Sequence, residues 1–265
     1  MFSSVACGFG YVRSTNEYKV VRIHYIDYDE GEVEVYTLGS GCGWRAIGSV
    51  PYRLDSWSNE TGTYANDNIF WILDKEVLAF DLVDEEFWLP SPAPPCLTNG
   101  LKVEDKCGLV ALGRHLCLYM DKLRMEIWLL TESSDAEETW GMAFDIDYEA
   151  VVGSRKEKLE PILLTKKGEI IFLYDESVLY SYDTRTTCLK MISDNPIRDD
   201  YFEDVEAIAH LNTFASLEGM GEISKRHDVH PSQGRTPCDD AINELDRFAL
   251  GDDTDTTPFR FGLSA

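Results

Sequence analysis

A six-residue pattern with an aromatic side chain at its fourth position recurs four times along the chain. The copies start at residues 33, 77, 125 and 179, and they carry Tyr36, Phe80, Trp128 and Tyr182 at that position. Each copy is rich in the aromatic, β-branched and other apolar residues that are typical of strands. A spacing of roughly 45–50 residues is that of propeller blades, so this repeat constrains the fold more than any other feature.

Each copy is one arm of a β-hairpin or lies next to another strand. In the first repeat, Tyr18–Tyr25 and the strand that starts at Val33 flank a turn at 29–31, and the second and fourth repeats have turns at 74–76 and 175–177. A further apolar strand follows each copy, at 44–47, 87–89, 140–144 and 188–192. The sequence therefore predicts an all-β, β-propeller-like fold with about four recognisable four-stranded units. The alternative is a sandwich of many hairpins.

The composition changes near residue 219. We expect one domain over residues 1–218 and an acidic, mostly disordered tail over 219–265, because the tail is rich in Gly, Ser, Thr, Asp and Pro and has few strand patterns. Within the tail, Ile242, Leu245 and Ala249 have helical spacing after a capping Asp239 or Asp240, which favours a short helix over 239–250.

The charge and the cysteines limit the partners and the compartment. Asp plus Glu outnumber Lys plus Arg by 48 to 24, which gives a formal net charge of −24. Such a surface repels phosphate, so the sequence predicts binding neither to nucleic acid nor to an anionic membrane. The acidic runs are solvated loops or, alternatively, a surface for a basic partner.

There is no apolar run of about 18 residues, no secretory leader pattern and no Cys-x-x-Cys among seven cysteines, so we expect an intracellular protein of the cytoplasm, the nucleus or both.

No catalytic constellation stands out. Nucleotide-binding loops, the nucleophile elbow of hydrolases and zinc-type histidine or cysteine spacings are absent from the sequence. The nearest approach to a metal pair is His227 with His230, which has no further convincing ligands nearby in the sequence. We therefore expect no catalytic residue, no metal and no cofactor. An enzyme that acts on a small molecule or glycan through carboxylates near a propeller axis is the alternative.

One segment between two repeats has the composition of a protein-binding site. It contains Tyr52, Arg53 and Trp57 within 51–60, and these residue types are enriched at the energetic centres of protein interfaces. We predict that these three residues contact a partner protein. The alternative is that Trp57 packs over a sheet edge.

The N-terminal part resembles the plant F-box-associated domain. The resemblance rests on the opening "GFGYVRSTNEYKVVRI" over Gly8–Ile23, on "VEVYTL" followed by "WRAI", on "GTYANDNIFW" over Gly62–Trp71 and on "VLAFDLVDEEFWLP" over Val77–Pro90. These motifs follow one another in the family's order. The similarity becomes looser up to about Leu217.

The resemblance implies a propeller-like domain that holds a target protein for ubiquitination by a cullin-based ligase. In the family, an F-box binds the ligase adaptor and further strands precede the "GFGY" motif. Because neither is seen in these 265 residues, we expect ligase binding to be indirect. We also expect an incomplete ring with an unpaired strand edge near Val5–Val12, unless strands within 205–217 complete the first unit. A shortened paralogue without activity is the remaining alternative.

Overall fold

The computed structural model describes ten parts of the chain. They comprise residues 4–25, 30–54, 61–90, 94–98, 106–132, 138–153, 158–175, 178–193, 206–211 and 259–264. Within these parts the structure is almost entirely β-strand, as the alternating and β-branched segments predict.

Sixteen strands form four consecutive antiparallel sheets, each with its strands in chain order. The first sheet consists of β1 (Ser4–Val12), β2 (Glu17–Tyr25), β3 (Gly31–Thr37) and β4 (Arg45–Val50). The second consists of β5 (Thr63–Ala65), β6 (Asn68–Leu73), β7 (Glu76–Asp81) and β8 (Phe87–Trp88). The third consists of β9 (Lys106–Leu112), β10 (His115–Asp121), β11 (Met125–Glu132) and β12 (Glu138–Ile146). The fourth consists of β13 (Leu159–Leu164), β14 (Glu169–Tyr174), β15 (Val178–Asp183) and β16 (Cys188–Ser193).

The remaining elements are short. The helix α1 (Pro95–Thr98) precedes the third sheet and α2 (Glu149–Val152) precedes the fourth. A separate two-stranded sheet pairs β17 (Glu206–Leu211) with β18 (Phe259–Ser264).

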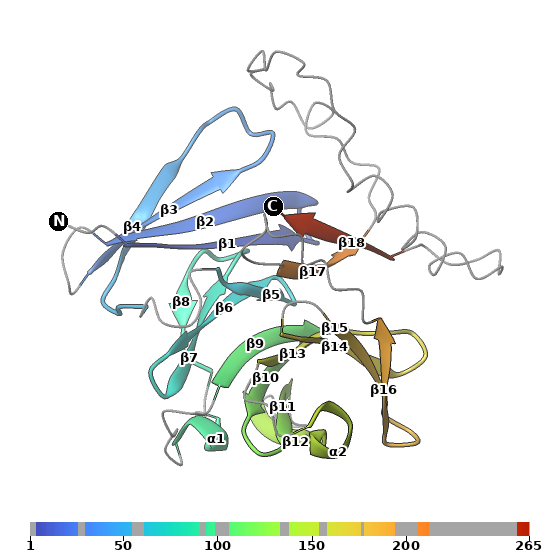
Figure 1. Cartoon of the computed structure of the whole chain (residues 1–265). Helices are drawn as coiled ribbons and strands as arrows, with labels where there is room; N and C mark the ends of the chain where they lie inside the picture. Colours follow the sequence, from blue (N-terminus) through green and yellow to red (C-terminus); the bar gives the residue numbers. More distant parts are fainter. Residues whose placement is uncertain are drawn as a thin grey trace.

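The four sheets follow one another around a common centre (Figure 1). Their first strands lie side by side: β1 beside β5, β5 beside β9, β9 beside β13, and β13 beside β17. At the first of these contacts the amide of Gly62 donates a hydrogen bond of 2.7 Å to the carbonyl oxygen of Cys7. This order of inner strands is that of propeller blades rather than of a two-layer sandwich, so the predicted fold class is confirmed.

A separate apolar core fills each space between neighbouring sheets. The core between the first and second sheets contains Ile23 and Phe80, the next contains Leu118, and the one between the third and fourth sheets contains Phe172. Alternate residues of a strand point to opposite faces, so each inner sheet contributes to two cores.

The glycines of the opening motif are needed at the first of these interfaces. A Cβ atom on Gly8 would lie 2.5 Å from Cγ2 of Ile69, and one on Gly10 would collide with Leu82 and Tyr64. The motif thus lets β1 approach the second sheet closely. It forms a strand, as predicted.

The four aromatic residues of the repeat occupy equivalent places on β3, β7, β11 and β15. Their shared place in the repeat predicts that all four are largely buried; Phe80 and Tyr182 are buried, whereas Tyr36 and Trp128 are only half-buried. The indole Nε1 of Trp128 reaches outward to a carboxylate oxygen of Glu126 at 3.3 Å. Phe80, Trp128 and Tyr182 each face the preceding sheet. Tyr36 lies on the first sheet, and no described sheet precedes it.

The described residues at the chain ends add detail to the expectations from the sequence. Part of the predicted tail forms the strand β18, because β17 has an open edge whose backbone groups need partners. Strand β17 pairs with β18 and does not join the first sheet, which already has four strands of its own. The edge of β1 is contacted by the second sheet, since the indole of Trp71 also donates to the carbonyl oxygen of Cys7. The predicted helix over 239–250 lies outside the described residues, and the domain boundary at 218 stays a prediction.

Candidate protein-interaction surface

The long connections between successive sheets all lie at one end of the blades. A four-stranded, up-and-down sheet returns the chain to the end where it entered. The parallel bridge between Cys7 and Thr61 shows that β1 and the segment that enters the second sheet run in the same direction. We call this the connection end. It contains the described parts of these connections, which are residues 51–54, 61–62, 89–90, 94–98, 147–153 and 158. The β10–β11 turn lies at the same end.

The first connection is anchored by the phenol of Tyr25 on β2. Its hydroxyl donates a hydrogen bond of 3.0 Å to the carbonyl oxygen of Tyr52 and accepts one of 3.2 Å from the amide of Leu54. Burial raises the pKa of Tyr25, although the amide of Leu54 and the charge of Arg53 oppose the increase. The phenol therefore stays protonated and can donate.

The three predicted partner-binding residues have different surroundings. The ring of Tyr52 is half-buried against the core between the first and second sheets. Arg53 is half-buried beside Tyr25. Trp57 lies outside the described residues. The structure thus brings Tyr52 and Arg53 to the connection end, and their contact with a partner stays a prediction.

The third connection is anchored by a buried carboxyl group. Tyr148 donates a hydrogen bond of 2.5 Å to Oδ1 of Asp121, and the amide of Leu159 donates one of 3.2 Å to Oδ2. Burial raises the pKa of Asp121, although both hydrogen bonds oppose the increase. Between these anchors, α2 exposes Val151, and the nearby β10–β11 turn exposes Leu123, whose surface is 87% accessible. The connection end therefore combines anchored backbone with exposed apolar side chains.

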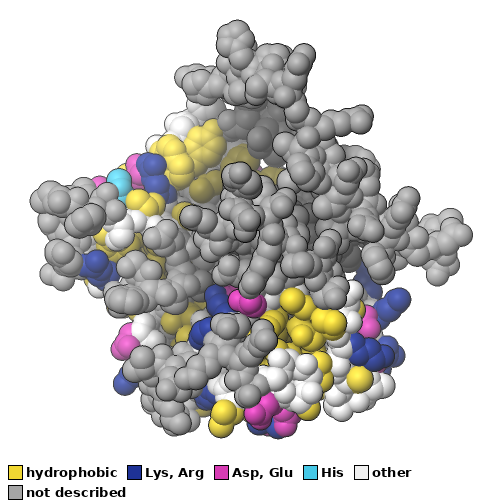
Figure 2. All heavy atoms as spheres, viewed as in Figure 1, with side chains coloured by type: hydrophobic (Ala, Val, Ile, Leu, Met, Phe, Trp, Pro, Cys, Tyr) yellow, Lys and Arg dark blue, Asp and Glu magenta, His cyan; other side chains and the backbone are white. Residues whose placement is uncertain are grey.

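A second surface, which the sequence analysis missed, is the outward face of the first sheet. It carries an aromatic group in which the rings of Phe9 and Tyr18 are stacked with their centroids 5.7 Å apart. The rings of Tyr36 and Trp44 are tilted with their centroids 5.5 Å apart. Phe9 is 51% exposed and Trp44 is 42% exposed. Figure 2 shows hydrophobic side chains at the surface in the region of this sheet. The sequence signal for this surface was Tyr36, the aromatic residue of the first repeat. Its equivalents in the later repeats pack on a preceding sheet, and no described sheet precedes the first one.

Charged groups adjoin this aromatic group. The guanidinium of Arg22 lies 4.2 Å from the ring centroid of Trp44 and 2.5 Å from Oε2 of Glu34. A cation above an indole is attracted by the ring's negative face. The outward face is therefore aromatic with a charged border, which is the composition of many protein interfaces.

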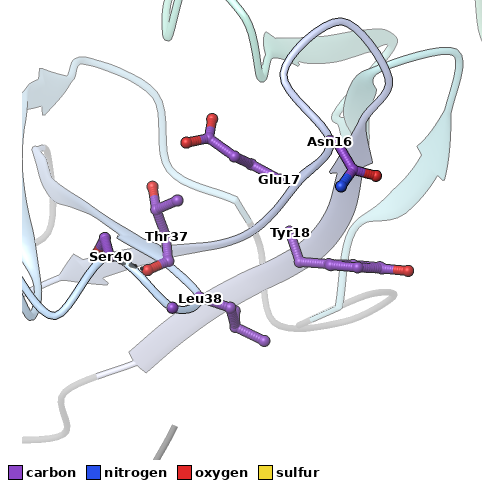
Figure 3. A pocket seen from close by; sticks show the side chains of 7 residues that line it. Asn16, Glu17, Tyr18, Thr37, Leu38 and Ser40 are labelled. Atoms are coloured by element: carbon purple, nitrogen blue, oxygen red, sulfur yellow. Dashed lines mark hydrogen bonds between the residues drawn. The ribbon is translucent and has the colours of Figure 1, made fainter. Parts of the chain in front are cut away.

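The described residues offer a small hollow at the opposite end of the first sheet (Figure 3). Its volume is about 220 Å³, and it is lined by Asn16, Glu17, Tyr18, Thr37, Leu38, Gly39 and Ser40. Sites for small-molecule ligands are usually about 300–1,000 Å³.

Within the described parts of the chain, no three His, Cys, Asp or Glu side chains come close enough together to hold a metal ion. None of the helices described is long and apolar enough to cross a membrane.

Four consecutive four-stranded sheets with adjacent inner strands define a β-propeller protein. The chain belongs to the family of the F-box associated beta propeller domain, whose model matches residues 1–212. The family suggested by the "GFGY" opening is thereby confirmed.

The chain is similar to two curated proteins of Arabidopsis thaliana. It is 27% identical to F-box protein At3g07870 over 224 residues, which cover 67% of this chain and 52% of the relative. It is also 27% identical to the putative F-box protein At4g17780 over 237 residues, which cover 82% of this chain and 57% of the relative. The chain therefore spans about half the length of these relatives. Among solved structures it is similar to AofleA from Arthrobotrys oligospora, with 10% identity, a TM-score of 0.45 and coverage of 78% of this chain and 64% of that one.

Proposed function

We propose that this chain is a non-enzymatic protein-interaction module that binds a target protein at its connection end. The observation that carries the proposal is the family match over residues 1–212. Relatives that are named F-box proteins support a role in recognising proteins for ubiquitination by a cullin-based ligase. In this proposal the protein acts in the cytoplasm, the nucleus or both.

The chemistry of the connection end supports this role. Arg53, Leu123 and Val151 offer a cation and two exposed apolar side chains, while Tyr25 and Asp121 hold the backbone beside them. A preorganised surface loses less entropy on binding than a mobile one. The bound protein then stays near the ligase, which raises the effective concentration of its lysines.

Two carboxyl groups with shifted pKa values, Asp121 and Glu85, serve the fold, which favours a binding role over carboxylate catalysis. Asp121 already accepts hydrogen bonds from Tyr148 and from the amide of Leu159. Glu85 is paired with Lys19 and Arg45. A general acid or base needs access to substrate, and these groups are occupied by structural partners.

The experiment compares the proteins that purified variants capture from plant extract treated with a proteasome inhibitor. We expect Arg53→Glu and Trp57→Ala to lower the capture of specific proteins by about tenfold, the loss typical of a residue central to an interface. The matched control is Arg114→Glu, which makes the same charge change in the β9–β10 turn at the opposite end. The captured protein is then tested for direct binding with purified components. Equal capture by all variants, or a loss only with Arg114→Glu, contradicts the proposal.

A further inference from the structure

The fourth sheet has a buried apolar face on the side away from the third sheet. Phe172 faces the third sheet, whereas its neighbours Ile171 and Leu173 lie on the opposite face together with Ile162. These three residues are only 6–7% exposed. Apolar side chains reach such burial only when another apolar surface covers them.

The two-stranded sheet of β17 and β18 is in position to cover this face. Strand β17 lies beside β13 and thus continues the series of inner strands, and Figure 1 draws the pair between the first and fourth sheets. A two-stranded sheet by itself is at best marginally stable in water, so it needs an apolar surface on which to pack.

The register of this small sheet makes it amphipathic. The apolar pairs are Ala207 with Leu263, Ala209 with Phe261, and Leu211 with Phe259. The intervening pairs are Glu206 with Ser264, Ile208 with Gly262, and His210 with Arg260. Because every second pair shares a face of a sheet, one face is entirely apolar and the other is mostly polar.

We propose that the outward face of the fourth sheet is a docking surface and that its occupant is the two-stranded sheet of β17 and β18. The C-terminal strand β18 is then part of the propeller. The family match ends at residue 212, so β18 is an addition from outside the matched region. The length of chain between Leu211 and Phe259 does not prevent the pairing, because the entropic cost of closing a loop grows only slowly with its length.

The first test uses hydrogen exchange on the full chain with two variants that introduce the same residue. Phe261→Gln changes the apolar register position, and Arg260→Gln changes its polar neighbour. We expect Phe261→Gln to accelerate exchange about tenfold or more in both 169–174 and 206–211, and Arg260→Gln to leave both segments close to wild type. Unchanged exchange in Phe261→Gln, or equal acceleration in both variants, overturns the proposal.

The second test examines the strand pairing on which the proposal depends, and it can be run even if Phe261→Gln fails to fold. Ile208 and Gly262 are direct cross-strand partners, so Ile208→Cys with Gly262→Cys should form a disulfide within one chain under mild oxidation. Glu206→Cys with Arg260→Cys is the control, because these positions are offset by four residues in the register. Mass spectrometry identifies the bond among the native cysteines. A disulfide between two chains would make a second copy the occupant and overturn the proposal, as would equal yields for the two pairs.

Discussion

The ammonium group of Lys19 on β2 lies 2.9 Å from Oε1 of Glu85, in the loop that follows β7 of the second sheet. It also donates a hydrogen bond of 2.6 Å to the carbonyl oxygen of Leu82. Arg45 on β4 donates to both oxygens of the same carboxylate, at 2.7 and 2.8 Å. Burial alone would raise the pKa of Glu85, but the hydrogen bonds from Lys19 and Arg45 lower it below the usual value. One carboxylate thus joins two strands of the first sheet to the second.

Glu85→Gln is expected to lower the free energy of unfolding by about 2–3 kcal/mol at pH 7, somewhat less than the cost of breaking a fully buried pair. Because the folded-state pKa of Glu85 is lowered, its contribution is complete above the unfolded pKa of about 4.3 and is lost as the pH falls through the folded value. Urea denaturation of wild type and variant at several pH values measures the difference. The control is Glu86→Gln at the exposed neighbour. A difference that persists unchanged at low pH contradicts the assignment.

Phe80→Ala and Tyr36→Ala should have clearly different effects on stability. Phe80 is fully buried, so its truncation should cost about 3–5 kcal/mol. Tyr36 holds the equivalent place on the first sheet but is half-buried, so its truncation should cost less than half as much. Equilibrium denaturation of wild type and both variants measures the two losses in the free energy of unfolding. Equal costs would show that the outward face of the first sheet is covered to the same extent as the faces of the inner sheets.

Tyr148→Phe removes one of the hydrogen bonds to the buried carboxyl group of Asp121. We expect a loss of about 1–3 kcal/mol, the cost of an unsatisfied buried acceptor. Carboxyl titration by NMR should give a pKa for Asp121 above about 3.9 in the wild type and higher still in the variant. Because this pKa is raised in the folded state, the folded protein loses stability as the pH rises from the unfolded to the folded value. Tyr11→Phe, which removes an exposed hydrogen bond to Asn16, is the control.

Residues 1–265 by themselves should not bind the adaptor of a cullin-based ligase, because none of the motifs that carry the family resemblance belongs to an F-box. Co-purification of the two purified proteins measures this, with a full-length F-box protein as the positive control. Stable binding by the 265 residues would overturn the prediction.

The ring is expected to be open between the first sheet and the sheet of β17 and β18, and the chain should then associate through its outward aromatic face. Size-exclusion chromatography with light scattering, at increasing protein concentration, should show species larger than a monomer. Phe9→Ser with Trp44→Ser should reduce this association, because both side chains are exposed on that face. A monodisperse wild-type monomer that melts cooperatively would contradict an open ring.

The amino-acid sequence by itself determined the strands and their order within each sheet. The hairpins around 74–76 and 175–177, the aromatic residue on each third strand and the "GFGY" strand were all predicted. These features are local, since they depend on side-chain alternation, β-propensity and turn residues within a few positions of one another. The family resemblance came from the same local motifs.

The tertiary structure alone decided what each face of a strand touches. Tyr36 and Phe80 have the same place in the repeat, yet Phe80 is buried and Tyr36 is not, because a described sheet precedes only one of them. Tyr52 was predicted for partner contact from its residue type, and only the structure shows that its ring packs on the core and that its carbonyl oxygen accepts from Tyr25. Phe259–Ser264 belongs to the tail that was expected to be mostly disordered, and only the tertiary structure pairs it with a strand nearly fifty residues earlier. Pairing and burial across such distances depend on which surfaces meet in space, and local sequence patterns do not encode that.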